Sequence, residues 1–226
     1  DGGGVFDNAG EFTMTNSTIS ENEAKMGGGI YAVISEVVMQ DSSISENEAK
    51  NSGGGVLIGN TSEFEISGNS IITGNKVTDG GHGSGGGGVI VGSQSTFTIK
   101  DTSKITNNIV TVSNADAASG GGGVYVSGGT FIMSDNSEIT ENEVDVNTEA
   151  DSHGGGGVFV YNGTFHMETN SKIAKNVVNR YGTGGGISVV SGTIQGTTEA
   201  NFLMEGGIIT ENEAKKEYLR GYRGHV

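Results

Sequence analysis

Apolar residues recur two positions apart along this chain, in short runs separated by glycine and polar residues. Each run covers about four or five residues and is bounded by Gly, Asn, Ser or Asp, which are the common turn formers. A spacing of two is typical of β-strands, whereas an amphipathic helix repeats about every 3.6 residues. The pattern therefore predicts many short strands and essentially no helix.

Three anchors repeat in the same order seven times. The first anchor is GGG followed by a branched residue, at Val5, Ile30, Val56, Val89, Val124, Val158 and Ile187. The second is an apolar-x-apolar triplet, at Phe12/Met14, Val37/Met39, Phe64/Ile66, Phe97/Ile99, Phe131/Met133, Phe165/Met167 and Phe202/Met204. The third reads Ile-x-x-Asn, at Ile19/Asn22, Ile44/Asn47, Ile72/Asn75, Ile105/Asn108, Ile139/Asn142, Ile173/Asn176 and Ile209/Asn212. A repeat of this kind predicts a solenoid.

The expected fold is all-β: a right-handed parallel β-helix (solenoid) of about seven coils, with three short strands per coil. Equivalent strands of neighbouring coils would lie about 4.8 Å apart, so each coil covers the one before it. Residues 1–214 form the predicted repeat domain, and residues 215–226 form a C-terminal tail or cap. The pentapeptide ENEAK occurs three times, at 21–25, 46–50 and 211–215. Its residues are good helix formers, but it follows the third anchor each time, so it is predicted to fill one turn position of the coil.

The pairing of Gly-Gly-x-[Val/Ile] with an apolar-x-x-Asn box resembles the polymorphic membrane proteins, a family of autotransporter adhesins. Gly28-Gly29-Ile30 following Ile19-Ser20-Glu21-Asn22 is an example, and the similarity extends over about residues 1–214. The chain has Gly where that family has Ala, and Ile where it has Phe. The resemblance implies a surface-exposed β-helix that attaches to host cells.

Composition narrows the classes of partner. The 226 residues include 42 Gly and no Cys, Pro or Trp, and the formal net charge is −15. Such an acidic chain is not expected to bind nucleic acid, and it can form no disulfide. No apolar run approaches the roughly 18 residues of a transmembrane segment. The absence of Cys fits an exported protein and equally a cytosolic one, and the family resemblance implies an extracellular or cell-surface location.

One strand of each coil carries a candidate contact surface. If the branched residue after GGG points into the core, the residue after it points outward. The outward row is then Phe6, Tyr31, Leu57, Ile90, Tyr125 and Phe159. An exposed apolar row of this length marks a contact site. Two alternatives remain open: neighbouring loops could fold over the row, or the pleat could be inverted.

Extra residues before GGG form the second candidate surface. They occupy 78–84, 111–119, 145–153 and 179–183, which fall at one corner of four consecutive coils. Insertions on one face of a repeat protein often mark its binding face, although a tolerant corner can also vary without function. The candidate binding residues there are Asp79, His82, Asp116, Asp151, His153 and Arg180.

No metal or cofactor is predicted, because the histidines and carboxylates follow no repeated ligand spacing. Calcium held between stacked glutamates such as Glu21 and Glu46 is the alternative. Catalytic residues are not predicted either, since the outward positions are mostly Ser, Thr, Asn and isolated charges.

The predicted function is non-catalytic adhesion or ligand binding, with a host or neighbouring cell-surface protein or glycan as partner. Two alternatives are a structural subunit that stacks head-to-tail with itself into an extracellular filament, and a carbohydrate-active β-helix enzyme. The enzyme would need a compact group of carboxylates.

Overall fold

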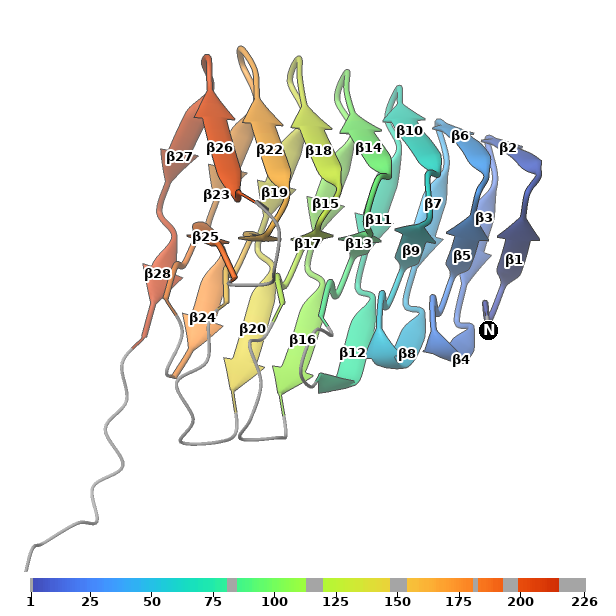
Figure 1. The fold of residues 1–226 in the computed structure, drawn as a ribbon, viewed down its shortest axis with the longest axis horizontal. Helices are drawn as coiled ribbons and strands as arrows, with labels where there is room; N and C mark the ends of the chain where they lie inside the picture. The colour runs from blue at the N-terminus through green and yellow to red at the C-terminus, as the bar shows by residue number, and fades with distance from the viewer. Residues whose placement is uncertain are drawn as a thin grey trace, which may run out of the picture.

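The computed structural model describes residues 2–80, 85–112, 120–146, 154–180, 183–192 and 199–215. These residues form 28 strands and no helix. The strands build four parallel sheets of seven strands each, and every coil contributes one strand to every sheet (Figure 1).

We call the sheets A to D in the order in which the chain visits them. Sheet A contains β1 (Val5–Asn8), β5 (Ile30–Val33), β9 (Val56–Gly59), β13 (Val89–Val91), β17 (Val124–Ser127), β21 (Val158–Tyr161) and β25 (Ile187–Val190). Sheet B contains β2 (Glu11–Thr15), β6 (Glu36–Gln40), β10 (Glu63–Ser67), β14 (Thr96–Ile99), β18 (Thr130–Met133), β22 (Thr164–Met167) and β26 (Asn201–Met204). Sheet C contains β3 (Thr18–Ser20), β7 (Ser43–Ser45), β11 (Ile71–Thr73), β15 (Lys104–Thr106), β19 (Glu138–Thr140), β23 (Lys172–Ala174) and β27 (Ile208–Thr210). Sheet D contains β4 (Glu23–Met26), β8 (Glu48–Ser52), β12 (Lys76–Gly80), β16 (Ile109–Val112), β20 (Glu143–Val146), β24 (Val177–Asn179) and β28 (Glu213–Ala214).

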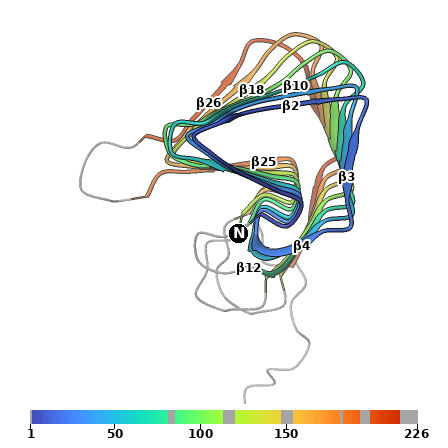
Figure 2. The same ribbon diagram turned by 90° about the vertical axis from the view of Figure 1, so that its right-hand side faces the viewer.

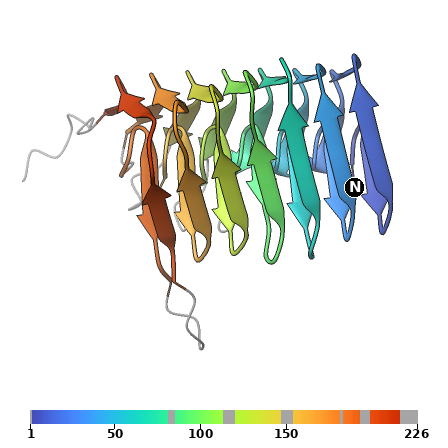
Figure 3. The same cartoon turned by 90° about the horizontal axis from the view of Figure 1, so that it is seen from above.

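The predicted parallel β-helix of seven coils is confirmed. Viewed along the rod the coils superimpose, and sheet A lies between sheets B and D (Figure 2). Seen from above, strands of successive coils lie side by side (Figure 3). The anchors stack as predicted, since Val89 pairs with both Val56 and Val124.

The prediction of three strands per coil is wrong, because sheet D adds a fourth. In coils 1, 2 and 7 this strand contains the end of ENEAK, whose only apolar residue is an alanine, such as Ala49, so the pentapeptide itself shows no apolar alternation. Coils 4 and 5 place Val-x-Val at the same position, with Val110 and Val112 in β16 and Val144 and Val146 in β20.

Two apolar columns fill the rod. The main core combines the inward residues of sheets A, B and C, including a column of rings from Phe64, Phe97, Phe131 and Phe165, of which the first three are stacked and the last is tilted. The second column belongs to sheet D and consists of Ala49, Val77, Val110, Val112, Val144, Val146 and Val178. Both columns are narrow, so a chain with only 33% hydrophobic residues can fill them.

The glycine runs sit where sheet D turns back toward sheet A. A Cβ added to Gly28 would lie 2.3 Å from the Gly54 carbonyl oxygen and 2.7 Å from that of Glu48, so backbone blocks any side chain. The preceding residue, Gly27, has a φ of +63°. Tight backbone packing explains why glycine returns there in every coil, and in coils 2 to 4 the left-handed turn at Gly27, Gly53 and Gly86 adds a second reason.

ENEAK is a corner followed by a strand. Glu46 has a left-handed φ of +54°, Asn47 is buried in the corner, and β8 begins at Glu48. Glu21 and Glu211 adopt the same conformation. Context therefore overrides the helix propensity of the pentapeptide.

The buried asparagines form a hydrogen-bonded ladder through the stack. The Asn75 backbone N–H and Nδ2 each donate to Oδ1 of Asn108, both at 3.0 Å, and Nδ2 also donates to the Ile44 carbonyl at 3.0 Å. The same pattern runs from Asn22 to Asn212. The asparagines of the third anchor therefore have a structural role in the stack.

Candidate binding surface

The strand register of sheet A aligns the six outward residues in one row. Tyr31 pairs with Phe6 and Leu57, Ile90 pairs with Leu57 and Tyr125, and Tyr125 pairs with Phe159. None of the six belongs to the main core. The predicted direction of the pleat is therefore confirmed.

The exposed fraction of the side chains falls steeply along this row, from Phe6 to Phe159. Phe6 is 55% exposed, Tyr31 and Leu57 are half-buried, and Ile90, Tyr125 and Phe159 are buried, the last completely. The prediction of an exposed surface is therefore wrong for Ile90, Tyr125 and Phe159. Only the first three coils present the row to solvent.

The buried residues form an apolar cluster separate from both cores. Ile90, Tyr125 and Phe159 make up this buried cluster, and Leu57, Tyr161 and Val190 pack against it. The Tyr125 and Phe159 rings stack at 5.3 Å between centroids, and Tyr161 lies 6.4 Å from Phe159. Covering large aromatic side chains in this way stabilises the fold through apolar burial.

The buried cluster changes the pKa of the Tyr125 hydroxyl. Burial raises the pKa of Tyr125, and a hydrogen bond with Ser127 acts in the opposite direction. A tyrosine hydroxyl that is buried usually keeps a hydrogen-bond partner.

We call Phe6, Tyr31 and Leu57 the open row. The rings of Phe6 and Tyr31 are 5.5 Å apart and tilted by 60°. The side chains come from β1, β5 and β9, whose backbones are fixed by parallel pairing. A rigid strand scaffold holds these aromatic groups in place without any loop.

The comparisons with known proteins identify the repeat. A family model described as a right-handed beta helix region matches residues 3–215. This chain belongs to the right-handed β-helix family. No curated protein and no solved structure matches it.

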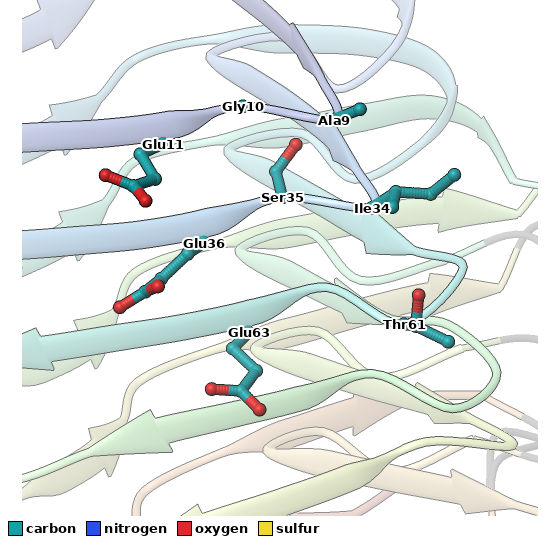
Figure 4. A pocket seen from close by; sticks show the side chains of 8 residues that line it. All are labelled: Ala9, Gly10, Glu11, Ile34, Ser35, Glu36, Thr61 and Glu63. Carbon is teal, nitrogen blue, oxygen red and sulfur yellow. The ribbon is translucent and has the colours of Figure 1, made fainter.

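This β-helix also has a shallow hollow at the corner between sheets A and B. Glu11, Glu36 and Glu63 project there side by side from β2, β6 and β10, next to Ile34 and Thr61 (Figure 4). The register places Glu36 directly opposite both of the other glutamates. No salt bridge among the described residues involves these three carboxylates. Like charges in register repel each other, so the hollow is a marked acidic feature.

Sequence reasoning missed this acidic row. Its signal is a glutamate immediately before the second anchor in coils 1, 2 and 3, where coils 4 to 6 have threonine. Aligning the coils on the anchors would have shown it.

The predicted corner residues are only partly described. His82, Asp116, Asp151 and His153 lie outside the described residues. Asp79 is half-buried in β12 of coil 3, and Arg180 follows β24 in coil 6, so two coils separate them. The structure does not bring these two together.

Arg180 borders a small polar hollow with Asp145, Asn179 and Lys215. Within the described ranges, no group of three or more His, Asp or Glu side chains could hold a metal ion. The same part of the chain contains no long apolar helix of the kind that crosses a membrane.

Proposed function

We propose that this β-helix is a non-catalytic binding protein, located outside the cell or on its surface, that attaches through the open row. Its partner is a protein or glycan on a host or neighbouring cell. The observation that carries the proposal is the open row itself. Phe6, Tyr31 and Leu57 remain accessible while the rest of the same row is covered.

The energetics favour this surface over others on the rod. Aromatic side chains dominate the energy of many interfaces, and a good anchor contributes at least about 2 kcal/mol when a partner buries it. An exposed aromatic pair stabilises the free protein little, so contact with a partner explains its presence better. Sugar rings and apolar side chains both fit the faces of such rings.

The finer family resemblance supports the same reading. The Gly-Gly-x-[Val/Ile] and apolar-x-x-Asn boxes resemble those of the polymorphic membrane adhesins, whose repeats attach to host cells. We therefore propose adhesion as the biological role. Binding needs neither a metal nor a catalytic group.

The test compares two variants on the same face of coils 1 and 2. Beads coated with the chain are applied to cultured epithelial cells and to a glycan array. The double variant Phe6→Ser and Tyr31→Ser should lose attachment while its circular dichroism stays unchanged. Ile34→Ser is the matched control, because Ile34 is as exposed as Phe6 but lies at the corner.

The outcomes distinguish the open row from the acidic hollow as the binding surface. Attachment that survives the double variant would refute the open row. Loss only with Ile34→Ser would move the site to the acidic hollow. A signal on the array without cell attachment would assign the partner as a glycan, and the reverse would favour a protein.

A further inference from the structure

The open row and a row of exposed carboxylates occur in the same three coils. We call Glu11, Glu36 and Glu63 the acidic row. In coil 2, Tyr31 of β5 is followed by Glu36 at the start of β6, and in coil 3, Leu57 of β9 is followed by Glu63 at the start of β10. Accessible apolar groups and exposed charges therefore occur together at this level of the rod.

Both features stop at the same coil boundary. The strand register places Glu63 next to Thr96, and Thr130 and Thr164 continue the same position in coils 5 and 6. In coils 4 to 6 the outward residues of sheet A, such as Tyr125, are buried. This position thus carries a charge where sheet A presents its apolar row to solvent, and a neutral hydroxyl where that row is covered.

The fold does not explain the acidic row. All three glutamates are exposed, and among the described residues none of them forms a salt bridge. Lys100, just after β14, pairs instead with Glu65 at 2.9 Å. Like charges in register on neighbouring strands destabilise a sheet, and threonine fills the same position in coils 4 to 6. A partner of opposite charge therefore accounts for the acidic row better than the fold does.

Exposed carboxylates act on a partner before it makes contact. At physiological salt a charge is felt over about 8 Å, and a hollow lined by charges of one sign raises the local concentration of partners of the other sign. The acidic row lines the hollow at the corner between sheets A and B (Figure 4), and sheet A also carries the open row. A cationic partner is therefore attracted to this corner, and an anionic partner is repelled.

This charge narrows the chemistry of the partner. Acidic glycans carry negative charge, whereas a protein surface can present lysine and arginine beside apolar groups. The whole chain has a formal net charge of −15, so it opposes the approach of an acidic glycan. A neutral glycan gains nothing from the acidic row.

We propose that the partner of the open row is a protein with a basic surface, and that the acidic row steers this surface onto the open row. The inference rests on the proposed function, because it names the partner of that same site. Charges near an interface set the rate of encounter, whereas the groups buried on contact set the lifetime of the complex. Steering acts without contact, so the glutamates and Ile34 stay outside the buried interface.

The experiment measures how fast the fluorescently labelled chain attaches to cultured epithelial cells and leaves them, at about 20 and 150 mM salt in isotonic sucrose. The double variant Glu36→Gln and Glu63→Gln should attach at least about threefold more slowly at low salt, and the difference should shrink at high salt. Its release rate should stay unchanged. The matched control is Glu21→Gln with Glu46→Gln, the same charge change on exposed glutamates at the corner between sheets C and D. This control should attach as the unchanged chain does.

Treatment of the cells identifies the class of partner. Acetylation of surface lysines with a membrane-impermeant reagent should abolish attachment, and so should digestion of surface proteins with trypsin. Sialidase, which removes acidic sugars, should leave attachment intact.

Three results would overturn the proposal: equal attachment rates for the two glutamine variants, full attachment to acetylated cells, and loss of attachment after sialidase treatment. Each of them leaves the open row as the binding surface if Phe6→Ser with Tyr31→Ser still abolishes attachment. Attachment that survives this open-row variant would instead refute the proposed function, and the inference with it.

Discussion

The contrast between Phe159 and Phe6 tests the division of the outward row. Both phenylalanines occupy the same ladder position, but Phe159 is 0% exposed and Phe6 is 55% exposed. Phe159→Ala should lower the free energy of unfolding by about 3–5 kcal/mol, the usual cost of emptying a buried phenylalanine site. The loss includes the stacking contact with Tyr125.

Phe6→Ala should change the free energy of unfolding by less than about 1 kcal/mol, because most of its ring already faces water. Phe159→Leu is the matched control. It keeps most of the volume and should cost less than about 1.5 kcal/mol. The assay is guanidinium denaturation followed by far-UV circular dichroism. Small and equal effects for both alanine variants would refute the buried cluster.

Four other predictions concern the core, the corners and the cluster. Phe131→Ala should lower the free energy of unfolding, measured by denaturation, by about 3–5 kcal/mol, and the outward Thr140→Ala should lower it by less than about 1 kcal/mol. Equal losses would contradict the assigned inward and outward faces. Asn108→Ala should lower the free energy of unfolding by at least about 2 kcal/mol, because it leaves ladder donors buried without an acceptor. Amide hydrogen exchange at that corner should become faster, and unchanged exchange would argue against the ladder. Ile34 is a branched residue with a φ of +56°. Ile34→Gly should raise the free energy of unfolding by about 1 kcal/mol, and a lower melting temperature would contradict the strained turn. Tyr125 should ionise above the ordinary tyrosine pKa in an ultraviolet titration. The stability that the neutral phenol gives the fold is then complete below the ordinary pKa and is lost as the pH rises through the raised pKa. An unshifted titration would contradict the burial of Tyr125.

The sequence predicted the stack because its anchors repeat with strict order. Val56, Val89 and Val124 each follow glycine, and the third anchor places an Asn in every coil. Those residues are dictated locally, by backbone crowding and by the ladder. The fold, its coil number and its inward faces could therefore be derived from residue types alone.

The fourth strand was harder to predict for a physical reason. Ala49 is the only apolar residue of β8, so this strand shows no apolar alternation in coil 2, and in coil 1 only Met26 follows Ala24. Parallel pairing with neighbouring coils, rather than local propensity, stabilises it. The Val-x-Val segments of coils 4 and 5 carried the missing signal.

The buried serines were also overlooked, although they repeat. Ser62 and Ser95 occupy one corner, and Ser70, Ser103 and Ser137 another. The Ser62 hydroxyl donates to the Gly59 carbonyl at 2.7 Å and accepts the Ser35 N–H at 3.1 Å. Serine is so common in exposed turns that its type alone does not indicate burial.

The candidate site was predictable only in part. The outward row follows from the pleat, but whether solvent reaches it depends on chain segments packed from elsewhere. Tyr31 and Tyr125 look equivalent in the repeat, yet only Tyr125 is buried. Exposure is a tertiary property that periodicity does not encode.

Hydroxyl-radical footprinting tests the central claim most directly, on the free chain and on the chain attached to cells. The account predicts that Phe6 and Tyr31 are oxidised in the free protein and protected on attachment, while Tyr125 and Phe159 are protected in both states. Oxidation of Tyr125 and Phe159 at the rate of Phe6, or no protection of Phe6 in the attached state, would contradict it.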